Sequence, residues 1–312
     1  MTPRDDYRRS VLAGLGLAVA AVFLPGCSSQ PANNRSINVT PSSSAVSTSA
    51  NPVKAGHAAV NGISLYYELH GSAPGTPLLL LHGGGSSIDV TYGRILPHLA
   101  ERRRVLALDE QAHGRSSDRA APVRFTSSAD DAAELLRQLD VERVDVMGFS
   151  NGASVALQLA LRHPERVRKL IFASSMTKRS GAAPQFWQFM AAATFADMPQ
   201  PLKDAFLQQN PDPQKLRAMH DKDLERMRNF AEVSDEEVRS VQAPTLVLAG
   251  DRDVPTPEHC IELTHLFPHA RLMILPGGHG DYLGELLATR PGDRAPELTA
   301  GLITSFLDAP PE

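Results

Sequence analysis

Short, mainly apolar runs recur along the chain after residue 77, and segments with helical spacing lie between them. Such a run is typical of a strand buried on both faces of a parallel sheet. Between two of the runs, the segment from Ser127 to Leu139 repeats its apolar positions at the period of a helix. The expected strands are Leu78–Leu81, Val105–Leu108, Val144–Met147, Lys169–Ala173, Thr245–Ala249 and Ala270–Leu275.

A hairpin is expected before these strands. Asn61-Gly62 accepts the positive φ angles of a two-residue turn, and it joins Ala58–Val60 to Leu65–Leu69 as two antiparallel edge strands. Alternation of strands and helices predicts an α/β fold, with a mostly parallel central sheet of about eight strands flanked by helices. Such sheets bind their ligands beyond the carboxyl ends of the strands.

Residues 175–243 interrupt the alternation, because they contain no strand signal. We expect a small helical lid inserted after the strand that ends near Ala173, since long excursions in compact domains are usually functional. A helical excursion without a role in binding is the alternative. The charged run from Asp221 to Arg228 is interpreted as a solvated helix face. The expected helices are Pro184–Phe195, Leu202–Gln209, Pro213–Asn229 and Asp235–Val241, and the aromatic residues gathered there are Phe186, Trp187, Phe189, Phe195, Phe206 and Phe230.

Residues 1–27 have the pattern of an export signal. Basic residues precede the uncharged apolar stretch Val11–Leu24, which is too short to span a bilayer comfortably. The stretch ends at Leu24-Pro25-Gly26-Cys27, which resembles a bacterial lipoprotein signal and implies lipidation of Cys27. A plain secretory signal with an incidental cysteine is the alternative. Arg8-Arg9 also resembles a twin-arginine export signal, with an ordinary basic start as its alternative.

Residues 28–52 are rich in Ser, Asn, Thr, Ala and Pro and predict a flexible tether. The expected organisation is therefore a signal peptide (1–27), the tether (28–52), a core (53–174 and 244–312) and the lid (175–243). A lipid at Cys27 would anchor the exported domain to a membrane of the bacterial cell envelope, on its periplasmic or outer side. Cys260 is expected to be a small buried hydrophobe, with no intramolecular disulfide.

Composition and charge narrow the classes of partner. The 312 residues carry a net charge of −4. Of these residues 42% are hydrophobic and 21% are charged, which is enough hydrophobic content for a sizeable core. This weakly negative net charge does not indicate a nucleic-acid-binding protein. No Cys/His cluster has metal-ligand spacing, and the sequence leaves the oligomeric state undetermined.

The pentapeptide Gly148-Phe149-Ser150-Asn151-Gly152 carries the strongest chemical signal. It lies between an expected strand and a segment with helical spacing. A serine between glycines at such a junction is held on a tight, strained turn with its hydroxyl exposed. An ordinary turn is the alternative, because the pentapeptide alone carries a real risk of a false match.

Three further polar segments also follow expected strands directly. His82-Gly83-Gly84-Gly85 comes after Leu81, Gly250-Asp251-Arg252-Asp253 after Ala249, and Gly277-Gly278-His279-Gly280 after the last strand. A serine, an aspartate and a histidine therefore follow one another in chain order. Because parallel strands end at one edge of the sheet, these segments are expected to meet there.

From about His57 to Leu307 the chain resembles the α/β-hydrolase family. Asp109-Glu110-Gln111-Ala112-His113-Gly114-Arg115-Ser116 is similar to the Asp-x-Arg-Gly-x-Gly-x-Ser segment of that family, and His163-Pro164-Glu165-Arg166-Val167 to its link into the next strand. Gln111 stands where arginine is often found, and Ala112 and Ala153 where glycine is frequent. None of these departures touches the expected chemistry.

The chemistry needs a nucleophile, a base and an acid. Ser150 is the expected nucleophile and His279 the base that takes its proton. The resemblance selects Asp253 as the acid that orients His279, with Asp251 as the alternative. It also implies backbone N–H groups that stabilise an oxyanion: that of Asn151, and that of Gly84, with Gly83 or Gly85 able to share the role. The remaining histidines are expected in surface, packing or structural roles, and His113 in a structural hydrogen bond.

The resemblance implies a serine hydrolase of carboxylic esters or related small acyl compounds, working through an acyl-enzyme on Ser150 without a cofactor or metal. The same three residues support carbon–carbon bond hydrolysis, lactone opening, acyl transfer and perhydrolysis. A non-catalytic binding module of the same fold is the alternative from a different class. Serine at position 150 argues against epoxide and haloalkane hydrolysis, which would use an aspartate there.

Overall fold

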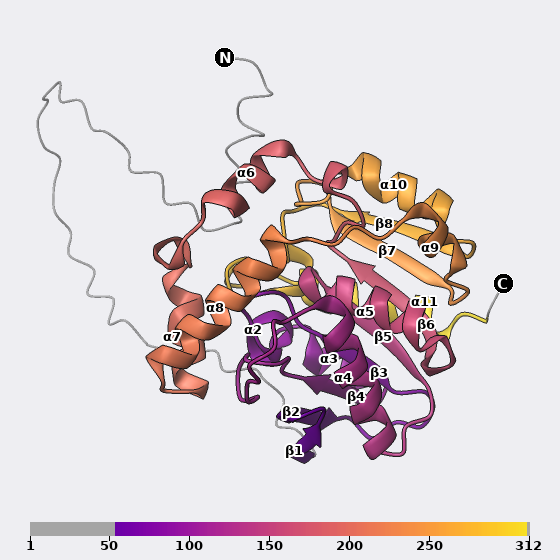
Figure 1. Cartoon of the computed structure of the whole chain (residues 1–312). Coiled ribbons are helices and arrows are strands. Elements are labelled where there is room, and N and C mark those ends of the chain that lie inside the picture. The colour runs from indigo at the N-terminus through magenta and orange to yellow at the C-terminus, as the bar shows by residue number, and fades with distance from the viewer. Residues whose placement is uncertain (1–53, 311–312) are drawn as a thin grey trace, which may run out of the picture.

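A single eight-stranded sheet organises the protein in the computed structural model, which describes residues 54–310 (Figure 1). Its strand order is β1-β2-β4-β3-β5-β6-β7-β8. The first three strands in this order pair antiparallel, and all other neighbours pair parallel. The strands are β1 Lys54–Val60, β2 Ile63–His70, β3 Leu78–Leu81, β4 Val105–Leu108, β5 Val144–Phe149, β6 Val167–Ala173, β7 Thr245–Gly250 and β8 Ala270–Leu275.

The expected fold class is confirmed, including the mostly parallel sheet and the flanking helices. One detail of the hairpin is wrong: β2 is not an edge strand, because it pairs with β4 on its other side. The signal expected at residues 1–27, the tether and the lipidation site Cys27 all lie outside the described residues. Within residues 54–310, no helix combines the length and the apolar character needed to cross a membrane.

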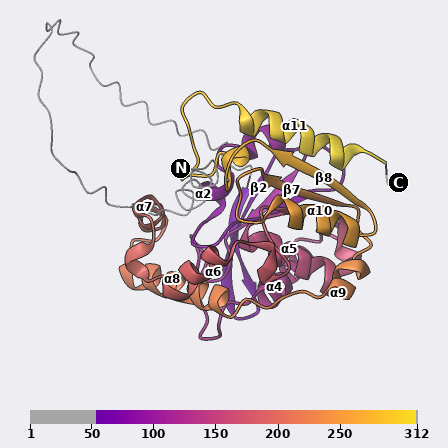
Figure 2. The same cartoon turned by 90° about the horizontal axis from the view of Figure 1, so that it is seen from above.

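Helices cover both faces of the sheet. Figure 2 shows α11 on one side and α4 with α5 on the other. The helices of the flanking layers are α2 Ile88–Tyr92, α3 Leu96–Ala100, α4 Phe125–Gln138, α5 Asn151–Arg162, α10 Pro257–Leu266 and α11 Ala295–Asp308, and the short 3₁₀ turns are η1 Pro164–Arg166, η2 Arg179–Gly181, η3 Phe195–Asp197 and η4 Asp281–Leu283.

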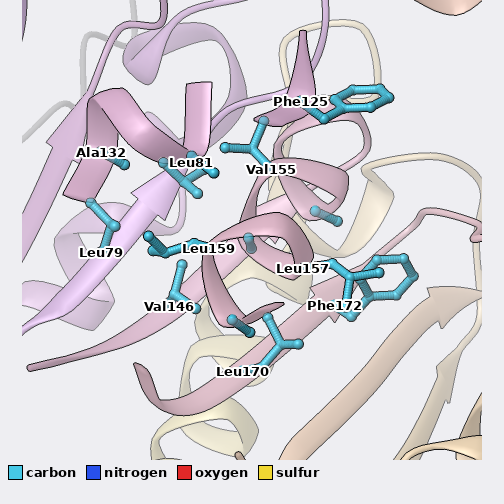
Figure 3. Packing of buried hydrophobic residues seen from close by; sticks show 14 of the residues in the cluster. Leu79, Leu81, Phe125, Ala132, Val146, Val155, Leu157, Leu159, Leu170 and Phe172 are labelled. Carbon is cyan, nitrogen blue, oxygen red and sulfur yellow. The ribbon is translucent and has the colours of Figure 1, made fainter. Parts of the chain in front are cut away.

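The core consists of one hydrophobic cluster on each face, which explains the continuous apolar runs. Successive side chains of a strand point to opposite faces. Leu79 and Leu81 accordingly pack with α4 and α5, as Figure 3 shows, whereas Leu78 and Leu80 belong to the cluster with α2, α3 and α11. All four leucines are fully buried. A strand of this kind has no solvent face and therefore no polar alternation.

Residues 175–243 form the helices α6 Pro184–Ala192, α7 Gln200–Gln209, α8 Pro213–Arg228 and α9 Asp235–Ser240. This stretch, which is described throughout, contains no strand and one isolated β-bridge, between Ala182 and Pro255. Figure 1 shows α6, α7 and α8 projecting beyond the sheet on the side where α5 begins. Cys260 is a free, buried thiol on α10.

Candidate active site

Ser150 occupies a strained turn between β5 and α5. Its φ and ψ are 55° and −120°, a conformation that L-residues rarely adopt. Close backbone contacts explain the two glycines around it. A Cβ at Gly148 would collide with the carbonyl of Gly152, and one at Gly152 would collide with the carbonyl of Leu81 at the end of β3. The turn is therefore held between two neighbouring strands.

His279 and Asp253 meet at the carboxyl ends of β7 and β8. The Nδ1 atom of His279 lies 2.7 Å from Oδ1 of Asp253. The N–H of Gly250 donates to the carboxylate over 3.0 Å, and the N–H of Val254 over 2.6 Å. The hydroxyl of Ser174, the residue after β6, also donates to it. Asp253 is 3% exposed. This buried carboxylate is fixed in place from three strand ends.

Charge complementarity stabilises the pair. Burial by itself raises the pKa of Asp253, but the charge of His279, its hydrogen bond and the donors from Ser174 and Gly250 lower it overall. Burial by itself lowers the pKa of His279, but the charge and hydrogen bond of Asp253 raise it above the ordinary 6.5. The arrangement favours a charged imidazolium once His279 takes a proton.

Asp251 has a different environment from Asp253. Its Oδ1 accepts the N–H of Gly277 over 2.7 Å, and its side chain is 53% exposed. A Cβ at Gly250 would collide with the carbonyl of Gly277, so the two loops are in close contact. Asp251 thus ties together the loops that carry Asp253 and His279, and the hydrogen bond to the imidazole comes from Asp253.

Ser150 and His279 border the same cavity. The ring of Phe149, next to Ser150, packs on the imidazole with its centroid 4.6 Å away. In the described part of the chain, no hydrogen bond joins the Ser150 hydroxyl to His279. Such bonds are often long before substrate binds and tighten in the complex.

Two backbone N–H groups beside Ser150 lack an acceptor among the residues that the structure describes. Of the three glycine amides after β3, that of Gly83 donates to Oγ1 of Thr91 over 3.2 Å and that of Gly85 to Oδ2 of Asp223. Within residues 54–310, no acceptor is paired with the N–H of Gly84 or with that of Asn151 at the start of α5. Both are available to a ligand atom near Ser150.

A cavity of about 230 Å³ opens above Ser150. Its floor consists of strand-end residues, and its roof comes from the helical segment between β6 and β7. Three of the six aromatic residues expected near the site line it, namely Phe186, Phe189 and Phe230. Aliphatic side chains complete the roof: Met190, Met198, Leu202, Leu224 and Met227. The cavity is therefore mainly apolar.

The interpretation of Asp221–Arg228 as a solvated helix face is wrong for Asp223 and Arg226, whereas Asp221, Glu225 and Arg228 are exposed as expected. Asp223 and Arg226 of α8 are 7% and 5% exposed. Arg226 donates to Asp223 and, over 2.9 Å, to Glu110 of the core. Nε2 of His113 lies 3.0 Å from Oδ2 of Asp223, so the expected structural hydrogen bond of His113 is present. Asp223 and Arg226 are three residues apart and therefore share one helix face. This spacing is the sequence signal that could have indicated their pairing.

Glu285, like Asp223 and Arg226, is a residue of the site that the sequence analysis did not identify. It follows η4 and lines the cavity with 8% exposure. Its Oε2 accepts the N–H of Leu287 over 2.7 Å. Burial raises the pKa of Glu285 to about 7.

His220, expected on the surface or in packing, also borders the cavity. Within the described range, no group of three or more His, Cys, Asp and Glu side chains has the arrangement to hold a metal ion.

Known proteins resemble this chain at the level of family and fold. A 2-hydroxymuconate semialdehyde hydrolase of Pseudomonas sp. (strain CF600) is 39% identical over 112 residues, which are 35% of this chain and 39% of that protein. The chain thus spans well under two thirds of that relative. A poly(3-hydroxyalkanoate) depolymerase of Ectopseudomonas oleovorans is 27% identical over 221 residues, 65% of this chain and 78% of that protein.

A solved structure of a hydrolase from Pseudomonas aeruginosa PA01 is 26% identical, with a TM-score of 0.63 over 83% of this chain and 100% of that one. Residues 76–235, just over half of the chain, match the family model described as alpha/beta hydrolase fold. The protein therefore belongs to the alpha/beta hydrolase fold family.

Proposed function

We propose that the protein is a serine hydrolase of carboxylic esters, with Ser150 as nucleophile, His279 as base and Asp253 as the acid that orients His279. The observation that carries the proposal is the hydrogen bond of 2.7 Å between His279 Nδ1 and buried Asp253, beside the strained Ser150 turn. This bond occupies Nδ1 and leaves Nε2 for proton transfer with Ser150.

In the first half of the proposed reaction, Ser150 Oγ attacks the ester carbonyl carbon while its proton passes to His279 Nε2. The negative charge on the carbonyl oxygen is stabilised by the N–H groups of Gly84 and Asn151, for which the described part of the chain offers no acceptor. The carbon–oxygen bond to the alcohol then breaks, and His279 returns the proton to the departing alcohol. An acyl-enzyme ester on Ser150 remains.

In the second half, a water molecule attacks the acyl carbon and gives a proton to His279. The bond to Ser150 Oγ breaks, Oγ recovers the proton, and the carboxylic acid leaves. Asp253 stabilises the imidazolium in both halves through its charge and hydrogen bond. The chain's own residues account for every proton transfer in this cycle.

The apolar lining of the cavity supports the proposal of an acyl substrate. The helical segment between β6 and β7 is proposed to act as the lid that excludes water. The relatives' names include a semialdehyde hydrolase and a depolymerase. Since substrates differ among relatives, the choice of esters rests on this chain's own site. Carbon–carbon bond hydrolysis, lactone opening and acyl transfer would use the same three residues.

The two aspartates allow a matched test with the full chain. We expect p-nitrophenyl butyrate to be hydrolysed, and Asp253→Asn to lower kcat by about 10³- to 10⁴-fold, because the imidazole loses the tautomer it needs. Asp251→Asn is the control, and its kcat should change by less than about 10-fold. Equal losses in the two variants would contradict the assignment of Asp253. Absence of hydrolysis across esters, lactones and β-diketones would instead favour a binding module.

A further inference from the structure

We infer that the cavity selects acyl esters without a negative charge, and that Glu285 is the residue that rejects anionic ones. This inference rests on the proposed ester hydrolysis at Ser150. It concerns the charge of the group that fills the cavity next to the reacting carbon.

Among the described residues, the lining of the cavity contains three acids but neither lysine nor arginine. The acids are Asp197, Asp223 and Glu285. A substrate carboxylate buried there would lose its hydration without gaining a lysine or arginine as partner, and His279 must be neutral to act as base, so burial of the carboxylate is unfavourable. Neutral acyl chains meet the aromatic and aliphatic roof instead.

Two of the three acids already have donors that offset their charge. Asp223 is paired with Arg226 and contacts His113 and the N–H of Gly85. Oδ2 of Asp197 accepts the N–H and the hydroxyl of Thr194, each over 2.8 Å. Their negative charges are therefore partly compensated before a substrate enters.

Glu285 is different, because within residues 54–310 no lysine or arginine forms an ion pair with it. The N–H of Leu287 donates to its carboxylate, and His279 is the charged neighbour that lowers its pKa. Glu285 also lies against the catalytic loop: a Cβ at Gly280 would stand 2.7 Å from the Cβ of Glu285. Its charge therefore acts on the His279 imidazole, which borders the same cavity as Ser150.

The charge of Glu285 changes within an accessible pH range, since burial raises its pKa to about 7. Several other charged groups face this region. Asp281 shares its loop, Arg94 packs against Gly284, and the remaining ones come from the cavity wall. Those wall residues are His279, Asp197, Asp223 and His220. Because neutral and anionic esters use the same His279, its titration cancels in the ratio of their kcat/KM values.

The test compares two p-nitrophenyl esters of similar length, the neutral heptanoate and the anionic mono-adipate, from pH 6 to pH 8 with the full chain. Two unit charges about 8 Å apart at an effective dielectric of about 20 correspond to roughly 30-fold. We expect the wild-type ratio of kcat/KM, heptanoate over mono-adipate, to rise about 10-fold between pH 6 and pH 8. In Glu285→Gln the ratio should stay close to the wild-type value at pH 6 and should not change with pH.

Leu287→Lys provides a second variant, which keeps the Glu285 side chain and adds a cation near it. Leu287 borders the cavity and is 37% exposed, so a lysine can keep its ammonium in water. This variant should raise kcat/KM for the mono-adipate by about 10-fold at pH 8. A wild-type ratio that does not change with pH, or a slope that persists in Glu285→Gln, would overturn the inference while leaving ester hydrolysis intact. Failure to hydrolyse either ester would overturn both.

Discussion

Removal of the Asp223 carboxylate tests whether α8 is anchored to the core by buried charge. In Asp223→Ala, Arg226 loses its partner on the same helix, and His113 and the N–H of Gly85 lose their acceptor. Glu110, at 2.9 Å, still pairs with Arg226. Breaking a buried ion pair costs about 3–5 kcal/mol. Because one partner of Arg226 remains, we expect a loss near the lower end, about 3 kcal/mol.

Asp221→Ala is the matched control on the same helix. Asp221 pairs with Arg217 at 2.7 Å, but the two side chains are 49% and 60% exposed. An exposed pair of this kind contributes about 0.3–0.5 kcal/mol. The same residue type is thus truncated in the same helix, and burial is the difference between the two sites.

The assay is urea unfolding at pH 7, with the free energy of unfolding taken from the midpoint and the slope. We expect the Asp223→Ala midpoint to fall well below that of Asp221→Ala, with similar slopes. Equal, small losses in the two variants would refute the reasoning and restore the interpretation of this run as a solvated face. Catalysis provides an independent readout, because Asp223 holds the N–H of Gly85 beside the proposed oxyanion donors.

Two further predictions concern stability. Because the folded pKa of Glu285 is raised to about 7 from 4.5, the folded state holds this proton longer than the unfolded state, so its contribution to stability falls as pH rises from about 4.5 to 7. Relative to Glu285→Gln, the wild type should lose about 3 kcal/mol between pH 4 and pH 8 in urea titrations, and parallel pH profiles would contradict this. Gly148→Ala should lose about 3 kcal/mol, the upper end for overpacking, because its Cβ collides with the carbonyl of Gly152. Gly301→Ala, in open space on α11, should instead gain about 0.5–1 kcal/mol. Thermal melts compare the two, and similar melting temperatures would count against the close approach at Gly148.

The sheet could be predicted from the sequence because burial on both faces leaves a local mark. Leu78–Leu81 and Val105–Leu108, in which every residue is buried, match their predicted bounds, and so does the more exposed edge strand β8. Other strands are longer than predicted: β5 and β7 continue into a glycine, β6 begins two residues earlier, and β1 begins at Lys54, four residues before its predicted start. Such ends depend on partners in the neighbouring strand.

The polar interior of the site was harder to predict. The partners of Asp223 and Arg226 are His113 and Glu110, more than 100 positions away, and a charged run shows no sign of such distant pairing. Glu285 belongs to no motif, and its environment arises where the His279 loop borders the cavity. Ser150, His279 and Asp253 could be selected because each follows a strand, so their neighbourhood depends on topology alone.

The central claim is that Ser150 becomes covalently acylated. The most direct measurement is peptide mapping by mass spectrometry after treatment of the full chain with a fluorophosphonate probe. We expect one adduct, on the peptide that contains Ser150, and none on that peptide in Ser150→Ala. An unlabelled Ser150 in a protein that still hydrolyses esters, or an adduct on another residue, would rule out Ser150 as the nucleophile.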